Sequence, residues 1–189
     1  DEASHRFVPF RPLALAVHAG FHLDEGDLAE AGRLVADAIS LGITDTLLVM
    51  EIELRLVTAR LAAARGDTRT ALAQVGNILA TLDQNGARYF LPQVLRLQAH
   101  YLLAIDDRAA ARDTLRRARS VAIDLGARNE LWILLADLAK IEGVEGNQDE
   151  MDSLLQNAHQ IVQEIAEQID DPALHMSFLA RAKALISSE

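Results

Sequence analysis

Apolar and polar positions alternate along this chain with the period of α-helices, and the helical stretches come in pairs separated by short polar breaks. The stretch from 99 to 118, AHYLLAIDDRAAARDTLRRA, contains one such unit: an apolar helical pattern, an acidic break and a second helical pattern. A fixed period in this size range indicates stacked repeats. Equivalent breaks occur 40 residues apart, at Gly26-Asp27, Gly66-Asp67, Asp106-Asp107 and Gly146-Asn147.

Side-chain size repeats together with the breaks. Small residues at fixed offsets allow two crossing helices to approach each other closely. Seven positions before each break stand Ala19, Ala59, Ala99 and Ala139. On the second helix of each unit the repeated positions are Ala31, Val35 and Ala38, then Ala71, Val75 and Ile78, then Ala111, Leu115 and Ala118, then Met151, Leu155 and Ala158. The pattern therefore predicts a succession of packed helix pairs.

This combination resembles the tetratricopeptide repeat, in which small residues lie on both helices and a large apolar residue lies on the second. The resemblance covers nearly all of residues 13–170. The chain departs from the family because its repeat is 40 residues long rather than about 34, and because the Trp, Gly and Tyr of the first helix are absent. The closing proline is replaced by Ile43, Asp83, Ile123 and Gln163. A long variant is implied, similar to the C-terminal arms of bacterial signalling ATPases and maltose-regulator-type transcription activators.

The resemblance implies an all-α, right-handed α-α superhelix of about four helix pairs and a C-terminal capping helix. We expect a single repeat domain over residues 13–189. Residues 1–12, with Pro9 and Pro12, are expected to form an irregular leader or linker end. The expected helix pairs span about 13–42, 46–86, 88–126 and 128–170, and the capping helix spans 172–187.

Helix starts are marked by acidic or hydroxyl residues, whose side chains can accept hydrogen bonds from free backbone N–H groups. Asp27 is placed to cap the second helix, Thr44 or Asp45 the third, and Asp171 the last. From Asp27 to Gly42 is 15 positions, whereas the two later copies of this segment, 67–86 and 107–126, each span 19. The second helix should therefore be about one turn shorter than its copies.

Composition and charge narrow the class of protein. The chain has 189 residues, a net charge of -10, 4% aromatic residues and no cysteine. The acidic balance argues against non-specific binding to nucleic acid or to an anionic membrane. No apolar run approaches the roughly 18 residues of a membrane span, and the N-terminus lacks the pattern of a secretion signal. A cytoplasmic location is the expectation, and the missing initiator Met suggests a piece of a longer chain.

The period places three basic residues at one position of successive first helices: Arg60, His100 and Lys140, with Arg96 one turn before His100. The resemblance implies that this position faces a concave groove, where peptide-carboxylate-binding members commonly carry Asn. One hypothesis is a basic column that binds an acidic peptide or an anionic ligand by charge-assisted hydrogen bonds. The alternative is a solvated or internally ion-paired face, for instance with Glu53.

A second basic feature lies on the helix after Asp107, where three arginines are spaced i, i+4, i+8. Such a stripe could contact phosphate, but the acidic chain favours a solvated or partner-facing stripe instead. The arginines of this helix are Arg108, Arg112, Arg116, Arg117 and Arg119.

His18 and His22 have the i, i+4 spacing of metal ligands. Only Asp24 or Glu25 could supply a third ligand, so a pair of partly buried histidines is the simpler interpretation, and we expect no metal site and no cofactor. The chain has no phosphate-binding glycine loop and no nucleophile elbow. The carboxylates from Glu142 to Glu150 are interpreted as an acidic rim, so we expect no enzymatic activity.

The expected function is a protein-interaction or signal-receiving module that binds a peptide or protein segment. The resemblance implies a repeat arm of a larger bacterial regulatory protein. Two alternatives remain open: a domain that senses a small-molecule inducer for a transcription regulator, and self-association through an uncovered N-terminal face with Leu13, Leu15 and Val17.

Overall fold

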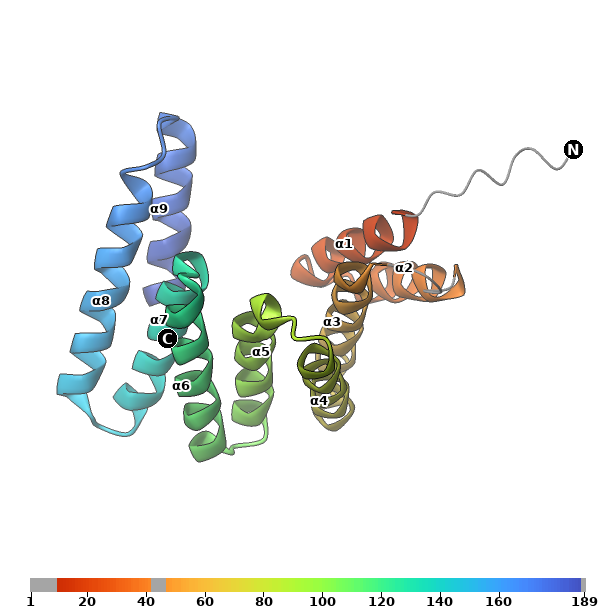
Figure 1. Cartoon of the computed structure of the whole chain (residues 1–189), viewed down its shortest axis with the longest axis horizontal. Helices are drawn as coiled ribbons and strands as arrows, with labels where there is room; N and C mark the ends of the chain where they lie inside the picture. Colours follow the sequence, from red (N-terminus) through yellow and green to blue (C-terminus); the bar gives the residue numbers. More distant parts are fainter. Residues whose placement is uncertain (1–9, 42–46, 188–189) are drawn as a thin grey trace, which may run out of the picture. The chain divides into compact units, whose positions relative to one another are not determined.

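The computed structural model describes residues 10–41 and 47–187, and in these ranges the chain forms α-helices and one short 3-10 turn, with no β-strand (Figure 1). The predicted all-α class is confirmed. The chain divides into two compact units, residues 1–81 and residues 82–189. The expectation of a single domain over 13–189 stays a prediction.

The first unit contains the first four helices of the described chain. α1 packs against α2 and α3, and α2 packs against α3. α3 is buried on more than one side. The helices are α1 (Arg11–Asp24), α2 (Leu28–Ser40), α3 (Leu48–Ala64) and α4 (Thr68–Gln84), the last of which ends just beyond the boundary of the unit. Their apolar core includes Ala16, Ala19, Ala31, Leu34, Val35, Ala38, Leu54, Val57 and Leu61.

The second unit repeats the pairing and adds a final helix. α5 pairs with α6, α6 contacts α7, α7 pairs with α8, and α9 packs against both α7 and α8 (Figure 1). Trp132 of α7 meets Phe178 of α9 edge to face, with ring centroids 6.3 Å apart. The elements are η1 (Arg88–Phe90), α5 (Leu91–Ala104), α6 (Arg108–Leu125), α7 (Arg128–Val144), α8 (Gln148–Ala166) and α9 (Pro172–Ser187).

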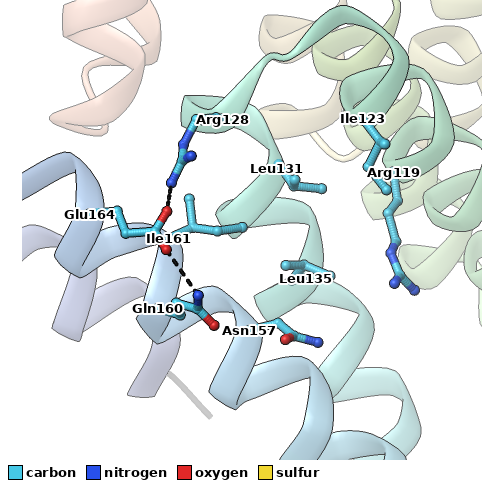
Figure 2. Close-up of a pocket in the computed structure, with 9 residues that line it drawn as sticks. All are labelled: Arg119, Ile123, Arg128, Leu131, Leu135, Asn157, Gln160, Ile161 and Glu164. Atoms are coloured by element: carbon cyan, nitrogen blue, oxygen red, sulfur yellow. Dashed lines mark hydrogen bonds and ion pairs between the residues drawn. The ribbon is translucent and has the colours of Figure 1, made fainter.

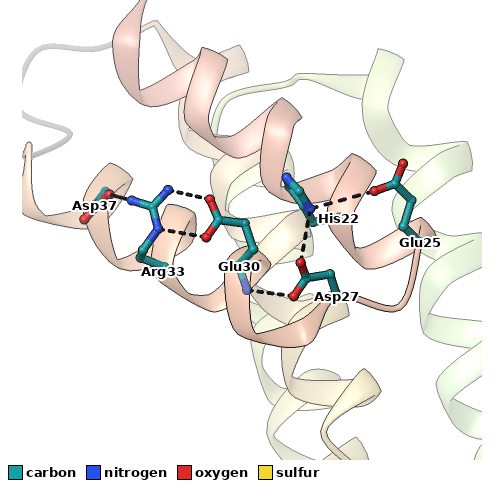
Figure 3. A network of polar contacts seen from close by, with 6 residues as sticks. All are labelled: His22, Glu25, Asp27, Glu30, Arg33 and Asp37. Atoms are coloured by element: carbon teal, nitrogen blue, oxygen red, sulfur yellow. Dashed lines mark hydrogen bonds and ion pairs between the residues drawn. The ribbon is translucent and has the colours of Figure 1, made fainter.

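The predicted caps hold the repeated turns. The Oδ1 atom of Asp27 accepts a hydrogen bond from the Glu30 amide at 3.0 Å, as Figure 3 shows. Asp67 and Asp107 make the equivalent bonds one and two repeats later, at 3.0 and 3.1 Å. Asp171 likewise caps α9. Side-chain caps of this kind satisfy amides that have no intrahelical partner, which fixes where each helix begins.

The first residue of each of the four breaks that recur every 40 residues adopts the left-handed conformation. Gly26, Gly66 and Gly146 have φ of 80°, 86° and 81°. In the third repeat Asp106 takes the same role with φ of 62°, and it is the one non-glycine residue with positive φ in the described ranges. Aspartate tolerates this region better than most side chains, which explains how the period continues without a glycine.

The predicted start of the first helix needs correction. α1 begins at Arg11, two residues before the expected start at Leu13, so the predicted leader overlaps the helix. Pro12 lies in the first turn, where a helix needs no N–H from it, and its side chain is buried.

Gly42, which was predicted to end the second helix, and Thr44 and Asp45, the predicted caps of the third, lie outside the described residues. α2 has 13 residues against 17 in α4 and 18 in α6, which confirms the shorter helix.

The last repeat departs from the predicted burial. Met151 and Leu155 are only half-buried, whereas their counterparts in the third repeat, Ala111 and Leu115, are fully buried. No further repeat pair follows α8 in the described ranges, and α9 covers it only in part. Leu174, in the first turn of α9, is 63% exposed.

Candidate functional site

A buried carboxylate on α7 interacts with two of the predicted basic residues. The side chain of Asp137 is 10% exposed, and its Oδ2 atom lies 2.5 Å from Arg96 Nε and 2.9 Å from His100 Nε2. Arg96 and His100 are one turn apart on α5, so both reach the same side of the helix. The structure therefore brings these two predicted residues together through an acidic partner that the sequence analysis missed.

The charge of this cluster is set by Asp137. Burial acts to raise the pKa of Asp137, but the hydrogen bond with His100 and the charge and hydrogen bond of Arg96 outweigh it and lower the pKa below its usual range. Arg96 binds through Nε, and its two Nη groups have no hydrogen-bond partner among the described residues. The guanidinium is thus held in place while part of its donor capacity remains unused.

Lys140 follows Asp137 by three residues on α7 and is half-exposed. Residues three apart lie on one side of a helix, so Lys140 belongs to the same face as Asp137. We call Arg96, His100, Asp137 and Lys140 the α5–α7 basic face. Asp137 could have been suspected from the sequence, because a single aspartate in the apolar run LLADLA of a buried helix requires a partner.

Arg60, the fourth predicted residue, lies on α3 in the first unit. Its Nη2 atom is 2.5 Å from Asp24 Oδ1 of α1, and both side chains are exposed at the surface. Glu53, the partner considered from the sequence, is half-buried; burial raises the pKa of Glu53, while the charge of Arg60 acts in the opposite direction. Arg60 therefore has an internal ion pair, with a different carboxylate from the one considered.

The arginine stripe of α6 is also paired within the chain. Glu142 of α7, 3% exposed, lies 3.2 Å from Arg116 and 4.0 Å from Arg112, and accepts a 2.6 Å hydrogen bond from Asn147. Arg112 binds Glu145 as well. Arg108 pairs with Asp106 at 3.2 Å. The interpretation of Glu142 as part of a solvated acidic rim was therefore wrong, because its carboxylate neutralises a stripe that was expected to face solvent or a partner.

The two histidines of α1 contact each other. Their ring centroids are 4.9 Å apart. Figure 3 shows the acidic neighbours of His22, whose Nδ1 atom lies 3.7 Å from Asp27 and 3.8 Å from Glu25. Within residues 10–41 and 47–187, no group of three or more His, Cys, Asp or Glu side chains is placed to hold a metal ion.

The N-terminal helix also carries exposed apolar side chains. Val17 and Phe21 are one turn apart on α1 and are 47% and 61% exposed, and Phe10 before the helix is 57% exposed. Leu13 and Leu15, named with Val17 for self-association, are half-buried. None of the helices in the described part of the chain combines the length and apolar character needed to cross a membrane.

Comparison with known proteins identifies the fold. No protein-family model matches the chain, and no curated protein matches it. A crystal structure of BtubC (BKLC) from P. vanneervenii is similar with a TM-score of 0.68 and 16% identity, over 90% of this chain and 70% of that one. Two structures of a Podosopora anserina putative kinesin light chain with nearly identical TPR-like repeats give TM-scores of 0.65 and 0.62. Their identities are 17% and 18%, over 96% and 94% of this chain and 89% and 87% of theirs. The chain therefore has the fold of TPR-like helical repeat proteins.

Proposed function

We propose that this chain is a protein-binding module whose α5–α7 basic face receives an acidic segment of a partner. The observation that carries the proposal is the buried carboxylate of Asp137, which holds Arg96 and His100 on one side of α5. Three basic side chains and one carboxylate therefore make up this face, on a chain whose net charge is -10.

The face has the properties of an anion receptor. A guanidinium that is already oriented loses less conformational freedom when it binds a carboxylate. Arg96 and His100 are 31% and 38% exposed, so a ligand can reach them. The similarity to TPR-like repeat structures supports a binding module, since repeat folds present extended surfaces to partners.

We propose further that the module is a repeat arm of a larger bacterial regulatory protein. The support is the resemblance of the 40-residue repeat to the arms of bacterial signalling ATPases. In such a protein the arm would bind a partner segment and the neighbouring domains would respond to it.

A blocked ten-residue peptide of alternating Gly and Glu tests the binding face by isothermal titration calorimetry, with a Gly and Gln peptide as the neutral control. We expect binding of the acidic peptide that weakens as salt rises, and no binding of the neutral peptide. Lys140→Ala and Arg96→Ala should each weaken binding about five- to tenfold, because each removes a charge-assisted contact.

Arg117→Ala is the matched control, since Arg117 is an exposed arginine of α6 outside this face. It should leave the affinity unchanged. Unchanged affinity in both Lys140→Ala and Arg96→Ala, with the fold intact by circular dichroism, would contradict the proposal.

A further inference from the structure

An open pocket of about 280 Å³ lies between α6, α7 and α8, and Figure 2 shows its lining. Leu135 at its base is 3% exposed, whereas Ile123 on α6 is 53% exposed. Leu131 and Ile161 complete the apolar part of the lining. The pocket thus offers apolar surface that continues from a buried base to an exposed edge.

One side of the pocket is closed by polar contacts within the chain. Arg128 of α7 forms an ion pair with Glu164 of α8, and Gln160 donates a 2.9 Å hydrogen bond to the same carboxylate (Figure 2). Hydrogen bonds from Arg128 and Gln160 lower the pKa of Glu164. An equivalent ion pair occurs one repeat earlier, between Arg88 of η1 and Asp124 of α6, so this contact recurs with the 40-residue period.

The other side of the pocket has an arginine without a partner. Arg119 of α6 makes no hydrogen bond or ion pair with any residue in the described ranges, whereas Arg108, Arg112 and Arg116 each meet a carboxylate. Figure 2 shows Arg119 across the pocket from the Arg128–Glu164 pair. A partly exposed cation beside apolar surface is complementary to a ligand that has both an apolar group and a carboxylate.

We propose that this pocket binds a short segment of a partner protein that inserts one apolar side chain and places a neighbouring Asp or Glu carboxylate on Arg119. The volume, at the lower end of the roughly 300–1,000 Å³ of ligand pockets, is enough for a single anchoring side chain. The side-chain amide of Asn157, on the edge of the pocket, has no hydrogen-bond partner among the described residues and can bond to the backbone of the segment. This pocket shares no residue with the α5–α7 basic face and is therefore a second docking surface.

The probe is the blocked peptide Gly-Ser-Gly-Phe-Asp-Gly-Ser-Gly, added to the ¹⁵N-labelled 189-residue chain and followed by ¹H–¹⁵N correlation spectra that include arginine Nε–H signals. Two companion peptides replace Phe by Ser or Asp by Asn. We expect shifts in resonances of α6, α7 and α8, binding about five- to tenfold weaker for the Asn peptide, and no binding of the Ser peptide.

Matched variants distinguish binding in this pocket from non-specific binding through surface charge or apolar surface. Arg119→Ala should weaken the Phe-Asp peptide about five- to tenfold and remove the difference between the Asp and Asn peptides. Arg117→Ala, two residues away, should do neither. Ile123→Ser should weaken all peptides that carry Phe, whereas Ile105→Ser, at an equally exposed site after α5, should not. The wild-type side chains at 105, 117 and 123 are exposed, so these three variants should fold.

Three outcomes would overturn the proposal. The first is equal affinity of the wild-type chain for the Asp and Asn peptides. The second is binding of hydrocinnamate, a phenyl ring with a carboxylate, as tight as that of the peptide, which assigns the pocket to a small ligand. The third is the same shifts appearing without peptide as the protein concentration rises, which assigns it to a second copy. Each leaves the α5–α7 basic face untouched, because that face is tested with the Gly and Glu peptide.

Discussion

α7 carries two buried carboxylates that differ in what surrounds them. Asp137 and Glu142 are 8% and 3% exposed as whole residues and stand five positions apart. Five steps rotate a helix by about 140°, so the two side chains leave α7 in different directions. Asp137 meets α5, and Glu142 meets α6 and the turn that follows α7.

The partners of the two carboxylates differ in what they connect and in how far they remain exposed. Glu142 is bound by Arg112, Arg116 and Asn147, and this set connects α6, α7 and the following turn. Asp137 is bound by Arg96 and His100, which keep about a third of their side-chain surface exposed. The difference teaches that burial of a carboxylate does not by itself identify a site. A binding role requires basic partners that a ligand can still reach.

The largest expected effect comes from Glu142→Ala, which we expect to lower the free energy of unfolding by ~2–3 kcal/mol in urea denaturation. The change leaves Asn147 without its acceptor and removes a countercharge from Arg112, whose side chain is only 25% exposed. Glu142→Gln should cost less, because its amide oxygen can still accept from Asn147. Peptide binding at the α5–α7 basic face should be unchanged. A loss below ~0.5 kcal/mol in the Ala variant would contradict a structural role.

Asp137→Asn should have a smaller effect, about 1–2 kcal/mol at pH 7, because Arg96 and His100 can turn to solvent. The pH dependence of this loss of stability identifies the ionised carboxylate of Asp137 as its cause. Because the folded pKa of Asp137 is lowered, its ionised form stabilises the fold above the unfolded pKa of about 3.9. That contribution is lost as the pH falls through the folded value. Urea denaturation of both chains from pH 7 to pH 3 should show their difference shrinking below about pH 4; a difference that stays constant would sink this account.

The smallest effect is expected at an exposed carboxylate, which provides a baseline for the two buried ones. Asp124 pairs with Arg88 at 3.2 Å, and both side chains are more than half exposed. Asp124→Ala should change the free energy of unfolding by no more than ~0.5 kcal/mol, since exposed ion pairs are screened by water and salt. A loss as large as that of Asp137→Asn would remove the distinction between buried and exposed pairs in this protein.

Much of the fold could be predicted because it is encoded in local spacing. Asp27, Asp67 and Asp107 cap their helices as the 40-residue period requires, and the alanines that precede the breaks are fully or almost fully buried. The predicted start of α1 was wrong, because a proline in the first turn is compatible with a helix that begins before it. Each of these features depends on residues close together in sequence.

The site could be predicted only in part because its contacts join different helices. The i, i+4 spacing correctly placed Arg96 beside His100, but their partner Asp137 lies about 40 residues away. Which carboxylate they reach depends on how α5 and α7 are rotated about their axes, and no local spacing encodes that rotation. Arg60 shows the same limit, since it binds Asp24 and not the nearby Glu53 considered from the sequence.

The aspartate-capped turns also have a consequence for how the chain acquires its structure. The turns capped by Asp27 and Asp107 each join two helices that pack against each other, and these contacts are near in sequence. Proteins dominated by such contacts have low contact order and fold in microseconds to milliseconds. Every hairpin therefore offers its own nucleus, and the order of assembly need not follow the order of synthesis.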